Sequence, residues 1–279
     1  MSPIRTHKYL VNGVRLNVAE VGHGPALVLI HGWSSSWIGW TLLAQQLAPN
    51  YHLYMIDLPG FGDSDRLKSY TVSAVATLLK DFIHQNCLRP KAIIGASLGT
   101  FISTYTLNHY PSLAPNLILL GAVFNQDSLK YASKYLMQFL GYANKTKSTQ
   151  LMVEKTVQSR YTAYLVEMFL NAYQFDKAKV DKYGIPGRRQ VTGKSYIELG
   201  ISASKIDLKH YLIHTHKPTL LIYGEAEKYT PVPTAQKIIT SLNNHHLQLQ
   251  IIPHAGHNPA YEQPLATATA IHHFLSSWV

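Results

Sequence analysis

A buried strand that runs directly into a serine flanked by glycines is the feature that most constrains this chain. Residues 92–95 form an apolar run, and Gly95-Ala96-Ser97-Leu98-Gly99 leads from it into a helical stretch that extends to about residue 108. A serine at a sharp strand-to-helix turn needs a strained backbone, and side chains two residues before and after it would collide with the neighbouring strand and helix. Glycine removes both clashes. The pattern therefore predicts that the Ser97 hydroxyl projects clear of a sheet.

Similar apolar runs recur along the chain and alternate with stretches of helical spacing. We expect strands at 8–10, 14–18, 26–30, 52–56, 92–95, 117–122, 219–223 and 247–252. Strands that alternate with helices are typical of a mostly parallel sheet with helices on both faces. Asn12-Gly13 lies between the first two runs and predicts a tight hairpin there. The predicted fold class is therefore α/β, with eight strands.

The alternation stops between residues 124 and 217. This segment has mainly helical spacing, nine tyrosines between Tyr131 and Tyr211, and an expected loop at 184–187. It holds 15 Lys and Arg against 7 Asp and Glu, a net charge of +8 out of +10 for the whole chain. We interpret it as a helical cap inserted into a core made of 1–123 and 218–279. Its positive charge marks a solvated face or attracts an anionic substrate.

Several classes of protein are disfavoured by the sequence. No signal-peptide pattern is present, and the longest strongly apolar stretch, 117–124, is too short for an integral membrane segment. The single cysteine, Cys87, forms no internal disulfide and favours a cytoplasmic location, where we expect it to be a packing residue. No basic block or nucleic-acid-binding signature occurs. His210, His214 and His216 lack a nearby carboxylate or cysteine set, so we predict no metal and no cofactor.

The motifs together resemble the α/β-hydrolase superfamily, over nearly the full length of the chain. The matching pieces, in chain order, are His31-Gly32-Trp33, Asp57-Leu58-Pro59-Gly60-Phe61-Gly62-Asp63-Ser64, Gly95–Gly99, Gly224, Ala255-Gly256-His257 and Glu262-Gln263-Pro264. The resemblance implies the α/β-hydrolase fold, with the cap inserted after the sixth strand. It also implies that Ser97 is a nucleophile and that Asp57 is a structural turn residue.

A serine hydroxyl needs a neighbouring base to take its proton. His257 lies just beyond the last predicted strand and completes the chain order serine, acid, histidine, with His254 as the alternative base. For the acid, the family usually has an aspartate three residues after the glycine that ends the seventh strand, and here that position is Glu227. Glu225 and, at the end of the sixth strand, Asp127 are the alternatives.

The remaining site residues are also assigned by resemblance. The backbone N–H groups of Trp33 and Leu98 are the expected oxyanion donors. Trp33, Trp37 and Phe124 are the expected substrate-binding side chains, although a series of tryptophans serves equally well as core. The predicted partner is a small acyl substrate.

A serine nucleophile separates this chain from relatives that use an aspartate at the same turn. We expect hydrolysis of a small carboxylic ester or lactone through an acyl-enzyme on Ser97. The alternatives are carbon–carbon bond hydrolysis of a ring-cleavage product, thioesterase or acyltransferase activity, and non-enzymatic ligand binding, since a fold alone does not define a function.

Overall fold

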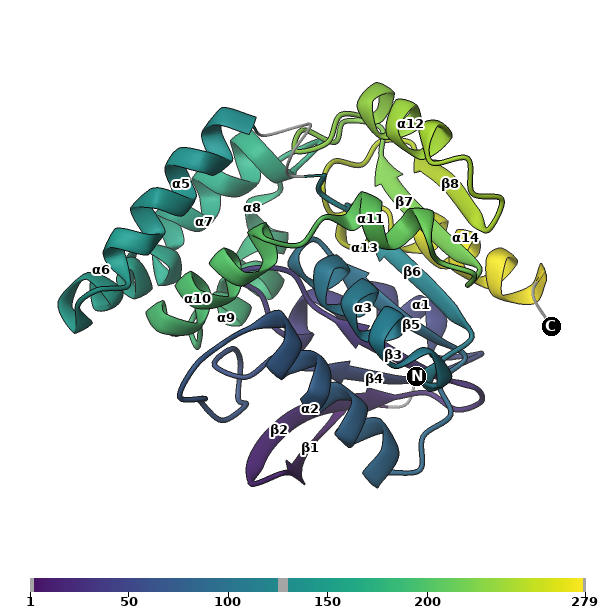
Figure 1. Cartoon of the computed structure of the whole chain (residues 1–279), viewed down its shortest axis with the longest axis horizontal. Coiled ribbons are helices and arrows are strands. Elements are labelled where there is room, and N and C mark those ends of the chain that lie inside the picture. Colours follow the sequence, from purple (N-terminus) through teal and green to yellow (C-terminus); the bar gives the residue numbers. More distant parts are fainter. Residues whose placement is uncertain (1–2, 125–129, 278–279) are drawn as a thin grey trace.

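A sheet of eight strands crosses the centre of the molecule (Figure 1). The computed structural model describes residues 3–124 and 130–277, with the backbone alone for 130–134. The strand order is β1-β2-β4-β3-β5-β6-β7-β8; the β1–β2 and β2–β4 pairs are antiparallel and the others are parallel. The strands are β1 (Arg5–Val11), β2 (Val14–Val21), β3 (Ala26–Ile30), β4 (His52–Ile56), β5 (Ala92–Ala96), β6 (Asn116–Leu120), β7 (Thr219–Gly224) and β8 (Leu247–Ile252). The predicted mostly parallel eight-stranded sheet is confirmed.

The first two strands form the hairpin that Asn12-Gly13 predicts. Both turn residues have positive φ, 50° at Asn12 and 81° at Gly13, as a two-residue turn that matches the strand twist requires. Val11 pairs with Val14 across this turn, which sets the register of the hairpin.

Burial along the strands follows their place in the sheet. All residues of β6 and β7 are buried, because helices cover both faces of these central strands. Strand β8 lies at the edge and alternates, so that Leu247, Leu249 and Ile251 pack against the core while Gln248 and Gln250 are exposed. The apolar runs of the sequence therefore correspond to central strands.

Helices form a layer on each face of the sheet. Alternate strand residues divide between two core clusters: Val28 and Ile30 belong to one, Leu27 and Leu29 to the other. The first cluster is covered by α2 (Val72–Gln85), α3 (Leu98–His109), α11 (Leu208–Ile213) and α12 (Val232–Ser241). The second is covered by η1 (Trp37–Trp40), α1 (Thr41–Leu47), α13 (Pro259–Glu262) and α14 (Pro264–Ser277).

A group of helices is inserted between β6 and β7, after the sixth strand, as predicted. The short η2 (Pro111–Leu113) lies before β6 and is not part of this group. Figure 1 shows these helices together beside the sheet. They are α5 (Lys130–Ala143), α6 (Lys147–Gln158), α7 (Arg160–Val166), η3 (Glu167–Asn171), α8 (Lys177–Lys179), η4 (Val180–Gly184), α9 (Ile185–Arg188) and α10 (Gly193–Ser204). Segments η3 and η4 are π-helical, a geometry that often occurs at functional sites.

Two local expectations are wrong. Residues 184–187, expected to form a loop, are helical: Gly184 ends η4 with an ordinary helical φ of −79°, and α9 continues from it through Pro186 without a break. Cys87, expected to pack in the core, is exposed and has a φ of 50° just beyond the end of α2.

Candidate active site

Ser97 lies at the turn between β5 and α3. Its backbone has φ 50° and ψ −112°, a conformation that side-chain-bearing residues rarely adopt. A Cβ on Gly95 would lie 2.2 Å from Ser103 Oγ, and a Cβ on Gly99 would lie 2.2 Å from the carbonyl oxygen of Ile30. The two glycines therefore let the turn pass between the neighbouring strand and its own helix.

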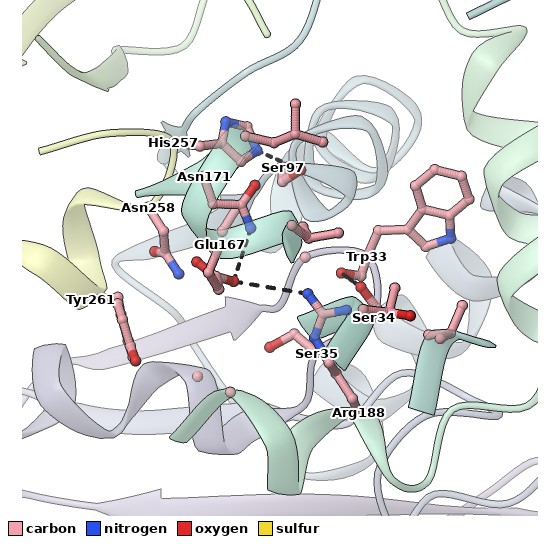
Figure 2. Close-up of a pocket in the computed structure, with 18 of the residues that line it drawn as sticks. Trp33, Ser34, Ser35, Ser97, Glu167, Asn171, Arg188, His257, Asn258 and Tyr261 are labelled. Atoms are coloured by element: carbon pink, nitrogen blue, oxygen red, sulfur yellow. Dashed lines mark hydrogen bonds and ion pairs between the residues drawn. The ribbon is translucent and has the colours of Figure 1, made fainter. Parts of the chain in front are cut away.

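A chain of hydrogen bonds connects Ser97 to two residues from later loops. Nε2 of His257 lies 3.0 Å from Ser97 Oγ, and Nδ1 of His257 lies 2.6 Å from Oε2 of Glu227 (Figure 2 shows the first pair). Glu227 is 4% exposed and His257 is 9% exposed. The geometry thus brings the predicted serine, histidine and glutamate together in one shielded place.

Two of the alternatives, the acid Glu225 and the base His254, do not join this chain. Glu225 is partly exposed and faces His254, with 3.7 Å between Oε1 and Nδ1. His254 is itself mostly exposed and its Nδ1 lies 3.3 Å from the Tyr173 hydroxyl. Asp127 falls outside the described residues.

The loop after β7 holds Glu227 in place. Its second carboxylate oxygen, Oε1, accepts a hydrogen bond of 2.7 Å from the backbone N–H of Tyr229. The Tyr229 ring lies 4.3 Å from the His257 ring, and its hydroxyl donates to Asn171 Oδ1. Burial raises the pKa of Tyr229 above its ordinary value, so this hydroxyl stays protonated. Glutamate thus satisfies the site despite being one methylene longer than aspartate.

The buried side chain of His31 connects two loops near the site. His31 Nδ1 lies 2.8 Å from the carbonyl oxygen of Gly32, and its Nε2 accepts from the backbone N–H of Leu58 at 3.1 Å. Burial lowers the pKa of His31 to about 4, so the ring is neutral near pH 7.

Asp57 has the structural role that the resemblance implies. It is fully buried and accepts hydrogen bonds from the backbone N–H groups of Trp37 and Asp63 and from Asn17 Nδ2. Burial raises its pKa to about 6, against the opposing effect of these hydrogen bonds.

The expected oxyanion donors belong to two residues, Trp33 and Leu98, that line one cavity together with Ser97. Leu98 is the first residue of α3, and the first N–H groups of a helix have no acceptor within the helix. Gly32 contacts the strand-to-helix turn at Ser97, here called the elbow, since a Cβ added to Gly32 would lie 3.3 Å from Ser97 Cβ. Trp33 is the next residue along the chain. The Trp33 ring stacks on Tyr196 of the cap at 4.2 Å, and its Nε1 donates to the Tyr196 carbonyl.

Two cavities meet at Ser97, and Trp33, Leu136, Leu170 and Tyr229 line both of them. The first, here called the Arg188 cavity, has a volume of about 320 Å³ and contains His257. Its polar lining includes Ser34, Ser35, Glu167, Asn171, Arg188 and Asn258 (Figure 2). The second, the Phe101 cavity, has a volume of about 330 Å³ and a mainly apolar lining that includes Phe101, Val123 and Met137.

Not every expected pocket residue lines these cavities. Trp33 lines both, whereas Trp37 packs against the core cluster under α1 and Phe124 is buried in the core beside Val123. Among the described residues that line either cavity, neither Trp37 nor Phe124 occurs.

The cap contributes residues that the sequence alone did not indicate. The carbonyl oxygen of Asn171, in η3, accepts from the backbone N–H of His257 at 2.7 Å. The contact is tight, because a Cβ on Gly256 would lie 2.1 Å from that carbonyl oxygen. Glu262 also bridges cap and core, with Oε1 accepting from Tyr173 N and Oε2 from Gly256 N. The cap therefore helps to position the loop that carries His257.

Among the described residues, no three or more His, Cys, Asp or Glu side chains are grouped so that they could hold a metal ion. Within the same residues, no helix is both long and apolar enough to span a bilayer.

The fold and the elbow define a class of protein. The chain belongs to the alpha/beta hydrolase fold family, which matches residues 25–264. It is therefore an α/β-hydrolase, and its curated relatives include proteins named as an esterase and a lipase.

Among these relatives, it is 25% identical over 234 residues to a pimeloyl-acyl-carrier-protein methyl ester esterase of Vibrio vulnificus (strain YJ016), covering 79% of this chain and 83% of that one. It is 24% identical over 272 residues to the monoacylglycerol lipase ABHD6 of Bos taurus, covering 92% and 77% of the two chains.

Solved structures share the fold. A membrane phospholipase A superposes with a TM-score of 0.77 at 22% identity, covering 98% of this chain and 86% of that chain. An esterase from Thermogutta terrifontis superposes with a TM-score of 0.76 at 18% identity, covering 98% of each chain.

Proposed function

We propose that this chain is a serine hydrolase that cleaves a small carboxylic ester or lactone through an acyl-enzyme on Ser97. The observation that carries the proposal is the hydrogen-bonded chain Glu227–His257–Ser97, which ends at a strained elbow between two cavities. In this proposal Ser97 is the nucleophile, His257 the general base and Glu227 the acid that orients the imidazole. The named esterase and lipase relatives support this class of reaction.

The proposed acylation follows from the two hydrogen bonds of His257. Nε2 takes the proton of Ser97 as Oγ attacks the carbonyl carbon of the substrate, and Nδ1–H donates to Glu227 throughout. Glu227 therefore fixes the tautomer and stabilises the imidazolium that forms. The same Nε2 then gives the proton to the leaving alcohol oxygen. Water repeats the sequence to release the acid.

The oxyanion of the tetrahedral intermediate needs donors that are fixed in advance. We assign this role to the backbone N–H groups of Leu98 and Trp33, in agreement with the position of Leu98 at the helix N-terminus. Cap contacts hold the Trp33 loop, since Gly200 of α10 lies directly against the Trp33 ring. Pre-set donors of this kind avoid reorganisation during the reaction.

The two cavities divide the substrate at the ester bond. The leaving oxygen receives its proton from His257, so the alcohol portion lies on the side where His257 is exposed to substrate, the Arg188 cavity. The acyl portion then occupies the Phe101 cavity, whose apolar lining suits a short hydrocarbon chain. We also propose a cytoplasmic location, since the lone thiol of Cys87 is compatible with a reducing compartment.

A fluorophosphonate probe tests the nucleophile. Ser97 is expected to carry the adduct, located by peptide mass spectrometry, and Ser97→Ala should abolish labelling and lower ester turnover by about 10⁴-fold or more. The exposed Ser73, changed to alanine, serves as the control and should label normally. A folded protein that stays unlabelled and hydrolyses no ester or lactone of a short-chain panel would contradict the proposal and favour ligand binding without catalysis.

A further inference from the structure

Arg188 is a buried cation to which the described residues offer no hydrogen bond. It lies at the end of α9, is 6% exposed, and its guanidinium points into the cavity that contains Ser97 and His257 (Figure 2). In the part of the chain whose side chains are described, its five N–H donors have no hydrogen-bond acceptor. Because a guanidinium stays charged at all ordinary pH values, a group of this kind needs an acceptor from elsewhere.

The nearest carboxylate satisfies Arg188 only in part. Oε1 of Glu167 lies 3.8 Å from Nη2 of Arg188, too far for a hydrogen bond, and the same oxygen accepts from Asn171 Nδ2 at 2.9 Å. Glu167 therefore holds the guanidinium in place through its charge and leaves the donors facing the cavity unused. Figure 2 shows Arg188 between Glu167 and the Ser34–Ser35 segment.

We propose that Arg188 binds a carboxylate on the alcohol portion of the substrate, which makes the substrate an apolar acyl chain esterified to a hydroxy acid. The guanidinium fork matches a carboxylate with two parallel hydrogen bonds. The net charge of +8 between residues 124 and 217 also favours an anion near the cap. This inference rests on the proposed function, because it uses His257 to place the alcohol in the Arg188 cavity.

The overall reaction balances without another reactant. The acyl carbon loses its bond to the alcohol oxygen, gains one to Ser97 Oγ and then exchanges it for one to water. The hydroxy acid leaves with a proton from His257, and the fatty acid leaves after hydrolysis of the acyl-enzyme. Arg188 takes no part in these bonds and acts as a specificity residue.

Three esters with the same acyl chain test the inference. They are γ-hexanoyloxybutanoate, its uncharged amide γ-hexanoyloxybutanamide, and monohexanoylglycerol. The wild-type protein should prefer the carboxylate, and Arg188→Gln should lower its kcat/KM by about 10- to 100-fold, the scale of a charge-assisted hydrogen bond, with less than about a 3-fold change for the amide. Arg188→Lys should retain part of the preference, because it keeps the charge but loses the fork.

Arg189→Gln is the matched control, since Arg189 is adjacent in sequence but exposed. It removes the same charge from the cap and should leave the ratio of carboxylate to amide unchanged. If Arg188→Gln lowered kcat/KM equally for all three esters, Arg188 would have a structural role and would not select the carboxylate. A selective loss for monohexanoylglycerol would show that hydroxyls, shared between Arg188 and Glu167, are the true ligand. Either result overturns the inference.

Binding to Ser97→Ala separates this inference from the proposed chemistry. Calorimetry should show that γ-hexanoyloxybutanoate binds Ser97→Ala more tightly than the amide does, and that Arg188→Gln in this background removes the difference. If binding follows this pattern but no ester is hydrolysed by the wild type, the proposed function fails and the anion site stands. If esters are hydrolysed but neither binding nor turnover depends on Arg188, the anion site fails alone.

Discussion

Glu227 accepts hydrogen bonds through both oxygens of its carboxylate. Both of its carboxylate oxygens are engaged, one by His257 Nδ1 and the other by the backbone N–H of Tyr229. A glutamine in its place would have an NH₂ group facing either His257 Nδ1–H or the Tyr229 N–H, and two donors cannot form a hydrogen bond with each other. The charge of Glu227, and not only its shape, is therefore the property to test.

We expect Glu227→Gln to lower kcat by about three to four orders of magnitude, because the imidazole then loses its orienting anion and favours the wrong tautomer. Glu225→Gln is the matched control, as Glu225 is partly exposed and faces His254. Steady-state kinetics with a short-chain ester, together with circular dichroism to confirm folding, measure both variants. Similar losses in the two variants would contradict the assignment of the acid.

His31 makes the stability of the protein depend on pH. Its folded pKa of about 4 lies below the ordinary value of 6.5, so the folded state binds this proton more weakly than the unfolded state. The stability linked to neutral His31 is complete above about pH 6.5 and is lost as the pH falls towards 4, by up to about 3 kcal/mol.

Urea denaturation of the wild type at pH 7 and pH 4.5 gives the net change in stability, which also contains the opposite contribution of Asp57, whose raised pKa favours the folded state at low pH. The contribution of His31 is the amount by which His31→Gln shifts this difference towards greater stability at pH 4.5. The exposed His23, changed to glutamine, should keep the wild-type difference. The same acid sensitivity in His31→Gln would place its origin elsewhere.

At the scale of single residues, the sequence predicts groups whose chemistry is tied to a local motif. Ser97 follows a strand and lies between glycines, while Glu227 and His257 follow the last two strands in the order that a triad requires. Arg188 and Glu167 have no such motif. Their burial depends on how the cap helices pack against each other, and this packing is not encoded in any short pattern.

The turn from β5 to α3 is the structural element on which the site depends most. The helix can leave the sheet at this angle only because Gly99 has no side chain toward the carbonyl oxygen of Ile30. Sequence motifs describe such a turn well, since a steric rule operates over a few residues.

Gly99→Ala should therefore destabilise the protein by about 2 kcal/mol or more and reduce activity, because its Cβ would lie 2.2 Å from backbone that cannot move easily. Gly141→Ala is the control: this glycine lies in α5 with nothing within 4 Å of a Cβ, so alanine should stabilise the helix by about 0.5–1 kcal/mol. Thermal denaturation compares the two. A neutral Gly99→Ala would show that the turn adjusts.

Elements with a strong apolar pattern are predicted closely, and weakly patterned ones are not. The central strands β3, β5, β6 and β7 match because each is an almost uninterrupted apolar run, whereas β1 and β2 extend beyond the expected 8–10 and 14–18 into residues that include polar side chains. The expected loop at 184–187 is wrong because glycine and proline favour turns on average, whereas here they lie inside the continuous helical stretch from η4 to α9.

At the scale of the whole molecule, cap and core share one backbone contact at the histidine loop. The carbonyl oxygen of Asn171 accepts from His257 N, and Gly256 allows the close approach. The composition of 124–217 predicted a cap but not this contact, because two segments that are distant in the chain meet only after folding. The boundaries of the cap domain at 124 and 217 stay a prediction.

We expect Gly256→Ala to lower kcat/KM by at least about 10-fold while the sheet stays folded, because its Cβ would push Asn171 and Tyr173 away from the loop. Hydrogen exchange should show faster exchange at His257 N, whose acceptor is then displaced. Gly141→Ala, far from this contact, should leave exchange at the loop unchanged. Full activity in Gly256→Ala would show that the cap does not position His257.

Ser97 and His257 are 160 positions apart along the chain. During translation the ribosome therefore completes the elbow, and then the entire cap, well before it adds the imidazole on which the proposed chemistry depends. A nascent chain therefore holds an unactivated hydroxyl while those 160 residues are added, and under the proposed function a product that ends within the cap hydrolyses no ester. Under the proposed function, reactivity arises only after His257 has been added and has folded against Ser97.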